Sequence, residues 1–255
     1  MRIPIIAGNW KMHKTIPEAV ALVAALKAPL AEIEGVDKVV CPTAVCLSAV
    51  RAAIGDAPIG LGAQNVHFEE EGAYTGEIAP RMLEGLCEYV IIGHSERRGY
   101  FDETDEMVNS KIKAALAHHL TPIVCVGETL QLRKAGQTHS WVGKQVVAAL
   151  EGLSASQVAG IVLAYEPIWA IGTGVSATSE DAQEVIGGVI RPLIAKLYDV
   201  QTSEAIRIQY GGSVKPDNAA ELMTMPDVDG GLVGGASLNA GDFAEVVRLT
   251  ARSRA

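Results

Sequence analysis

The chain has 255 residues, of which 49% are hydrophobic and 20% are charged, and its formal net charge is −9. This composition supplies a substantial core and argues against intrinsic disorder. The negative charge, without a long run of Lys or Arg, argues against a nucleic-acid partner, so local donors must hold any anionic substrate.

Eight short apolar runs rich in Val and Ile recur along the chain. Most lack the alternation of apolar and polar residues that marks a half-exposed strand, which indicates strands buried on both faces of a parallel sheet. We therefore predict eight strands. The runs are IPIIA (3–7), KVVC (38–41), IGLGA (59–63), YVIIG (89–93), TPIVCVG (121–127), GIVLAY (160–165), IRIQY (206–210) and GGLVGG (230–235).

Segments with helical periodicity lie between these runs. Thr15 to Glu18 has the spacing of a capping box and precedes an apolar stripe. Further helices are predicted from Thr178 to Leu197, which starts with acidic residues, and from Phe243 to Leu249. The first stripe is Ile16, Val20, Val23, Leu26 and Leu30, and the second helix would bury Ile186, Ile190, Leu193 and Leu197.

Alternating strands and helices form either a doubly wound open sheet or a closed (β/α)8 barrel. The count of eight favours the barrel, and barrels of this kind have about 250 residues. No Ser/Gly-rich or Pro-rich linker divides the chain. We predict an α/β fold with a single (β/α)8 barrel domain over residues 1–255; a doubly wound sheet with one miscounted strand is the alternative.

Features that mark export or a bound metal are missing from the sequence. Residues 1–6 lead directly into the polar stretch GNWKMHK, so we expect no signal peptide, no membrane span and a cytoplasmic location. Cys41, Cys46, Cys87 and Cys125 form no C-x-x-C pair. We therefore expect reduced thiols and no thiolate metal site.

Chemically active side chains stand just after the predicted strands, where barrels place their active sites. We expect them to surround one mouth of the barrel. They are Asn9 and Lys11 after the first strand, His94, Ser95 and Glu96 after the fourth, Glu128 after the fifth and Glu166 after the sixth.

Glycine pairs end the last two predicted strands, in Gly211-Gly212-Ser213 and Gly234-Gly235. Without a Cβ, the backbone can bring its N–H groups close to an anion, and the loops after strands seven and eight are the usual phosphate site of a barrel. Tight turns would be the alternative explanation. Two pairs at consecutive strand ends favour phosphate binding.

Glu166 opens the stretch EPIWAIGTG, residues 166–174. The ordinary pKa of glutamate is about 4.3, so this carboxylate would be ionised at neutral pH and able to accept a proton. A surface glutamate paired with a basic residue is the alternative. Trp169 and Ile171 argue against it, because a loop with these side chains gains by folding over something apolar.

His94 and Lys11 each have a catalytic and a structural interpretation. A histidine near a helix N-terminus would be disfavoured in its charged form, leaving a neutral N–H to donate to a substrate oxygen; a capping or core histidine is the alternative. Lys11 is either a pocket cation facing developing negative charge or an ordinary surface lysine.

Six stretches, GNWKMH, IIGHSERR, VCVGE, AYEPIWAIGTG, YGGSV and DGGLVGGASL, closely resemble the triosephosphate isomerase family and occur in the family's order, from Gly8 to about Leu238. The resemblance implies interconversion of dihydroxyacetone phosphate and D-glyceraldehyde 3-phosphate in glycolysis and gluconeogenesis, without metal or organic cofactor. It implies that Glu166 moves a proton between C1 and C2, that neutral His94 polarises the carbonyl, and that Lys11 faces the enediolate.

The same resemblance assigns the surrounding residues. Ser95 and Glu96 would support the catalytic groups, Cys125 would pack behind the glutamate, and residues 167–169 and 175–177 would be hinges of a closing lid. The second hinge, Val175-Ser176-Ala177, departs from the family's commoner Lys-Thr-Ala, which puts the closing rate in doubt. The implied substrate contacts are Asn9, Lys11, Gly172, Ser213, Gly234 and Gly235.

The stretch GAYTGEIAP, residues 72–80, resembles the family's loop that crosses into a second subunit. It implies a homodimer in which Thr75 approaches the partner's active site. Without the resemblance, an ordinary surface turn would be the better interpretation.

Other functions remain open on the residues alone. A metal-dependent epimerase would need a His/Asp cluster at the barrel mouth, and a Schiff-base aldolase would need a lysine at a central strand end. A phosphometabolite-binding or adhesion protein could keep the fold without turnover, because a fold does not fix a function.

Overall fold

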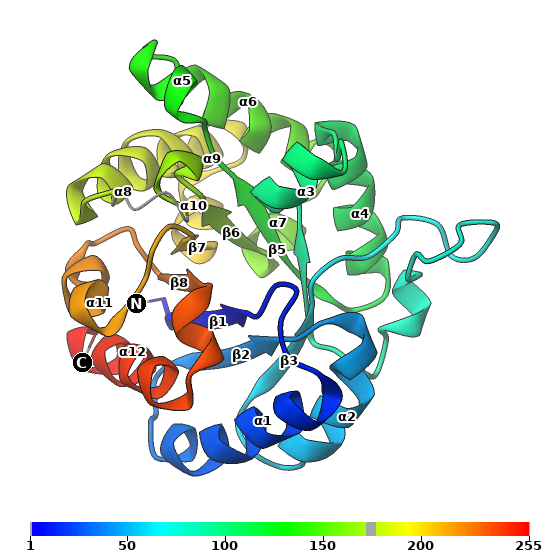
Figure 1. Cartoon of the computed structure of the whole chain (residues 1–255). Coiled ribbons are helices and arrows are strands. Elements are labelled where there is room, and N and C mark those ends of the chain that lie inside the picture. Colours follow the sequence, from blue (N-terminus) through cyan, green and yellow to red (C-terminus); the bar gives the residue numbers. More distant parts are fainter. Residues whose placement is uncertain (1, 172–176, 255) are drawn as a thin grey trace.

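Eight parallel strands pair in sequence order, and β8 pairs with β1, so the sheet closes into a barrel (Figure 1). The computed structural model describes residues 2–171 and 177–254. Each strand overlaps one of the predicted runs, and the closure excludes the doubly wound sheet. The strands are β1 (Ile5–Asn9), β2 (Asp37–Cys41), β3 (Gly60–Ala63), β4 (Tyr89–Ile92), β5 (Thr121–Val126), β6 (Val162–Tyr165), β7 (Arg207–Tyr210) and β8 (Gly230–Val233).

The strands are buried on both faces, as their composition predicts. Ile5 and Ala7 belong to a cluster made only of strand residues, which fills the inside of the barrel. Ile6, between them, belongs to the larger cluster that strands and helices share. Because successive side chains on a strand point to opposite faces, both faces need apolar residues.

Helices alternate with the strands and surround the barrel (Figure 1). That residues 1–255 form a single domain remains a prediction. The helices are α1 (Ile16–Ala31), α2 (Leu47–Ile54), α3 (Ser95–Tyr100), α4 (Asp105–Ala117), α5 (Leu130–Lys134), α6 (Thr138–Leu150), α7 (Ala155–Gly160), α8 (Ser179–Val185), α9 (Arg191–Leu197), α10 (Val200–Ala205), α11 (Pro216–Thr224) and α12 (Ala240–Ser253).

The buried face of α1 differs in part from the predicted stripe. Ile16 is 42% exposed, whereas Ala19 and Leu22 are buried with Val23, Leu26 and Leu30. Ile16 is the first residue of the helix, outside the packed face. Ala19 extends the buried face by one turn towards the N-terminus. The predicted stripe omitted it because that stripe contained only large apolar residues.

The helix predicted from Thr178 to Leu197 contains a turn of π-helix, Ile186–Ile190, between α8 and α9. Ile186 and Ile190 are buried as predicted, but Ile194 is buried in place of Leu193, and Leu197 is 43% exposed. A π-turn contains an extra residue, so it rotates the buried face of everything that follows it. The predicted C-terminal helix is present as α12.

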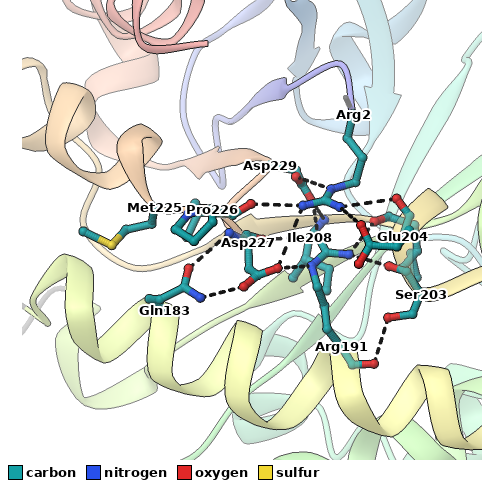
Figure 2. Close-up of polar contacts among 12 residues, drawn as sticks. Arg2, Gln183, Arg191, Ser203, Glu204, Ile208, Met225, Pro226, Asp227 and Asp229 are labelled. Carbon is teal, nitrogen blue, oxygen red and sulfur yellow. Dashed lines mark hydrogen bonds and ion pairs between the residues drawn. The ribbon is translucent and has the colours of Figure 1, made fainter. Parts of the chain in front are cut away.

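An ion network joins Arg2, which precedes β1, to Arg191 on α9 and to Asp227 and Asp229, which precede β8 (Figure 2). The Nε of Arg2 lies 2.6 Å from Oδ1 of Asp229, and Arg191 contacts Oδ2 of the same carboxylate. Arg191 also pairs with Asp227 at 2.7 Å. Asp229 accepts a bond from the amide of Ile208 at 2.9 Å, so one side chain links β7 to the start of β8.

Candidate active site

A cavity of about 660 Å³ lies at the carboxyl ends of the strands. Its lining contains eight of the catalytic and substrate-binding residues predicted from sequence, drawn from the ends of five different strands and the loops after them. These are Asn9, Lys11, His94, Glu96, Glu166, Ser213, Gly234 and Gly235. Gly172, predicted to belong to this set, lies outside the described residues, as do Val175 and Ser176 of the predicted hinge.

Glu166 follows β6 directly, and its side chain is almost completely buried. Its Oε2 accepts a hydrogen bond of 2.9 Å from the amide of Ser95. Its Oε1 lies 2.9 Å from Nε2 of His94, although the contact is not a well-aligned hydrogen bond. Burial raises the pKa of Glu166, but His94, the Ser95 amide and Lys11 outweigh burial and hold it below its usual value. The carboxylate is therefore ionised.

His94 caps the N-terminus of α3, and its Nδ1 accepts a hydrogen bond of 3.2 Å from the amide of Glu96. Because Nδ1 is an acceptor, a neutral ring carries its proton on Nε2, the nitrogen that faces Glu166 in the cavity. Burial lowers the pKa of His94, but the adjacent Glu166 carboxylate raises it further, so the net direction is upward. The sequence-based argument from the helix N-terminus omitted this carboxylate.

Lys11 adopts a backbone conformation unusual for a residue with a side chain, with φ of 51°. Such a conformation costs roughly 1–2 kcal/mol and needs support. The side chain of Asn9 accepts a bond of 3.0 Å from the Lys11 amide, and Nε2 of Gln64 donates to the Lys11 carbonyl at 2.9 Å. The ammonium of Lys11 forms an ion pair with Glu96. The strained turn thus carries the lysine into the cavity.

The two glycine pairs serve different purposes. A Cβ on Gly211 would lie 2.8 Å from Cγ of Glu166, and one on Gly212 would lie 2.2 Å from the hydroxyl of Tyr210, so both glycines are required by packing. Among the described residues, a Cβ on Gly235 would meet no atom within 4 Å, and one on Gly234 would touch only Lys11, at 3.7 Å. Packing does not explain this second pair, which leaves exposed backbone for a ligand to approach.

Comparison with known proteins identifies this arrangement. The family model for triosephosphate isomerase matches residues 4–250. Relatives named triosephosphate isomerase include one from Clostridium perfringens, 59% identical over 97% of this chain and 99% of its own length. Others come from Chloroflexus aurantiacus, 56% identical over 97% and 99%, and Herpetosiphon aurantiacus, 55% identical over 98% and 100%. The chain belongs to the triosephosphate isomerase family.

Three further residues that the sequence singled out, Ser95, Cys125 and Glu128, lie close to the cavity or beneath it. Ser95 contacts Glu166 through its amide, and Cys125 is fully buried on β5, where burial and then Glu166 raise the pKa of its thiol. The thiol is therefore protonated; that Cys125 packs behind the glutamate remains a prediction. Glu128, noted only for its strand-end position, is also fully buried.

Glu128 organises the segment that follows Glu166. It accepts a hydrogen bond of 2.8 Å from Nε1 of Trp169 and bonds of 3.1 and 3.2 Å from the hydroxyl of Tyr165. Arg133 covers the Trp169 ring at 4.7 Å. Sequence reasoning gave no role to Tyr165, although it stands in the stretch AYEPIWAIGTG. It missed Arg133 and Gln64 because neither stands in a recognised motif; the only signal for Gln64 was a polar residue directly after β3.

Thr75 lies away from this cavity, on the loop between β3 and η2 (Pro80–Met82), which projects from the barrel (Figure 1). Thr75 is exposed, as are Met12, Tyr100 and Phe101, which line a second cavity of about 500 Å³ beside the first. Exposed apolar groups around a hollow are typical of a protein–protein contact surface. Thr75 lines neither cavity of its own chain.

Within residues 2–171 and 177–254, no group of three or more His, Cys, Asp or Glu side chains is placed to hold a metal ion. No described helix is long and apolar enough to cross a membrane.

Proposed function

We propose that this chain interconverts dihydroxyacetone phosphate and D-glyceraldehyde 3-phosphate, the reaction that its family's name denotes. The observation that carries the proposal is the joint presence of Glu166, His94 and Lys11 in one cavity whose lining also contains the glycine-rich end of β8. An ionised base, a neutral donor and a cation are the three groups that a proton transfer next to a carbonyl needs.

In this mechanism Glu166 removes a proton from C1 of the ketone and returns it to C2 of the enediolate, while the proton of the C1 hydroxyl is transferred to the oxygen on C2. Nε2 of His94 donates to the carbonyl oxygen, on which negative charge develops, and Lys11 stabilises that charge. Glu166 must first leave the Ser95 amide and His94. Its departure removes the main contribution that raises the pKa of His94, so the imidazole is then neutral, with its N–H free for substrate.

The phosphate would be held by Ser213 and by the backbone of Gly234 and Gly235, with Gly172 as a further contact implied by the family resemblance. The unobstructed backbone at Gly234 and Gly235 supports this assignment. The 3-10 turn Gly235–Leu238 begins at the same point, so amide groups at its start are available to an anion. Asn9 would bind the triose itself and, through its bond to the Lys11 amide, would also support the strained turn.

We propose further that the working enzyme is a homodimer. The exposed Met12, Tyr100 and Phe101 line the second cavity, and the loop around Thr75 projects from the barrel, where it would meet such a cavity on another copy. The two cavities share Lys11 and His94, so an inserted loop would support both catalytic groups. The four cysteines are free and buried, which is compatible with work in the cytoplasm.

Turnover tests the proposed function. Purified protein should convert D-glyceraldehyde 3-phosphate to dihydroxyacetone phosphate, and excess EDTA should leave the rate unchanged. No conversion by folded protein would refute the proposal, and activity lost to EDTA would point to a metal-dependent relative.

A further inference from the structure

Among the described residues that line the cavity around Glu166, one lysine has no ion-pair partner. Its described lining holds two lysines, Lys11 and Lys215, and two glutamates, Glu96 and Glu166. Lys11 is paired with Glu96. Lys215 forms no ion pair with any residue in the described ranges 2–171 and 177–254, and it is exposed. Its charge is therefore available to a ligand.

Asn218 holds Lys215 at the rim of this cavity. The Nδ2 of Asn218 donates to the carbonyl of Ser213 at 2.8 Å, and its Oδ1 accepts from the amide of Lys215 at 2.9 Å. One amide side chain thus fixes the loop on both sides of Val214, which is only 3% exposed. Lys215 is consequently held next to Ser213, on the side of the cavity assigned to phosphate.

We propose that Lys215 attracts and anchors the phosphate group of the substrate; this inference rests on the proposed function. With Lys215, the lysines and glutamates of the described lining sum to zero, and without it they sum to −1. The whole chain carries −9. A phosphate dianion approaching such a protein is repelled unless a local cation counters the field at the entrance. Lys215 supplies that cation, whereas the backbone amides supply short-range hydrogen bonds.

The test compares Lys215→Gln with Lys196→Gln, which removes the same charge from an exposed site on α9 that does not line the cavity. A charge at the rim acts mainly on the rate of substrate association. Salt screens it, because the Debye length falls from about 30 Å at 0.01 M to about 8 Å at 0.15 M ionic strength. For Lys215→Gln we expect kcat/KM to fall about three- to tenfold at low ionic strength, through KM. The deficit should shrink on adding salt, and Lys215→Arg should restore most of the loss.

Two further measurements separate anchoring from a structural effect. The deficit should be much smaller with D-glyceraldehyde, which lacks the phosphate, and the dissociation constant of inorganic phosphate, measured by calorimetry, should rise by a similar factor. The proposal would be overturned if Lys215→Gln and Lys196→Gln had equal kcat/KM at low salt. It would also be overturned if the loss of kcat/KM were the same at all salt concentrations and with or without the phosphate on the substrate. If wild-type protein binds phosphate without turnover, the isomerase function fails, while the phosphate comparison still decides the role of Lys215.

Discussion

Nε2 of His94 lies 2.9 Å from Oε1 of Glu166, and the Glu96 amide donates to the other ring nitrogen. The proposed base and the proposed carbonyl donor are therefore in contact with each other before substrate arrives. Each lowers the cost of burying the other, and a substrate carbonyl must replace Glu166 at Nε2. The same contact explains the opposite pKa shifts of the two residues, downward for Glu166 and upward for His94.

Gln64 should act as a positioning residue for Lys11. In Gln64→Leu the carbonyls of Lys11 and Cys41 lose their shared donor, and the strained turn should relax and move the ammonium. Because small displacements in an active site are costly, we expect kcat/KM to fall by about tenfold or more. Steady-state kinetics would check this, with Gln131→Leu on exposed α5 as the matched control. Unchanged kinetics would show that Lys11 holds its conformation unaided.

The ion network at the opposite end of the barrel should govern stability. Arg191→Met leaves the carboxylates of Asp227 and Asp229 without their shared arginine, and breaking a buried pair costs about 3–5 kcal/mol. Denaturant unfolding should show this loss, while the kcat of the folded fraction stays close to wild type. Arg248→Met, which breaks an exposed pair with Glu245, should cost less than about 1 kcal/mol. Equal losses of unfolding free energy in the two variants would contradict the view that the network around Arg191 governs stability.

His118 should make stability depend on pH. Its Nδ1 lies 2.8 Å from Glu84 and its Nε2 lies 2.8 Å from Glu70, and these carboxylates raise the pKa of the ring. A group whose pKa is raised on folding stabilises the protein fully below its unfolded value, about 6.5, and loses that contribution as pH rises through the folded value. The difference in unfolding free energy between wild type and His118→Gln should therefore decrease from pH 6 to pH 9. A difference that is independent of pH would show that the contacts of His118 with Glu70 and Glu84 do not contribute to stability.

Thr75 tests the proposed dimer. Thr75→Glu places a charge on the loop that would enter the partner's hollow, so we expect a weaker dimer and a matching loss of kcat at low protein concentration. Sedimentation measurements with parallel kinetics would follow both quantities. Thr224→Glu, at the exposed end of α11, makes the same change elsewhere and should alter neither. A Thr75→Glu dimer as tight as wild type would rule out the interlocking loop.

The sequence predicts the barrel well because apolar strand runs and strand-end positions follow simple periodic rules. It also predicts the position of Glu166 and His94, since each directly follows a strand. It could not predict the π-turn at Ile186–Ile190, because Leu193 and Ile194 are both apolar and the sequence alone does not decide which of them faces the core. Gln64 was also missed, because its importance depends on the backbone conformation of Lys11, which the sequence does not show.

The most direct test of the account is proton exchange catalysed by Glu166→Gln in D₂O, with Glu184→Gln on the exposed surface as control. Wild type and the control should convert D-glyceraldehyde 3-phosphate and introduce deuterium next to the carbonyl, as measured by NMR. Glu166→Gln should fold normally and lose about 10²–10⁴-fold in both rates, because a neutral amide cannot accept the proton. Near-normal conversion and deuterium incorporation by Glu166→Gln would contradict its role as the base.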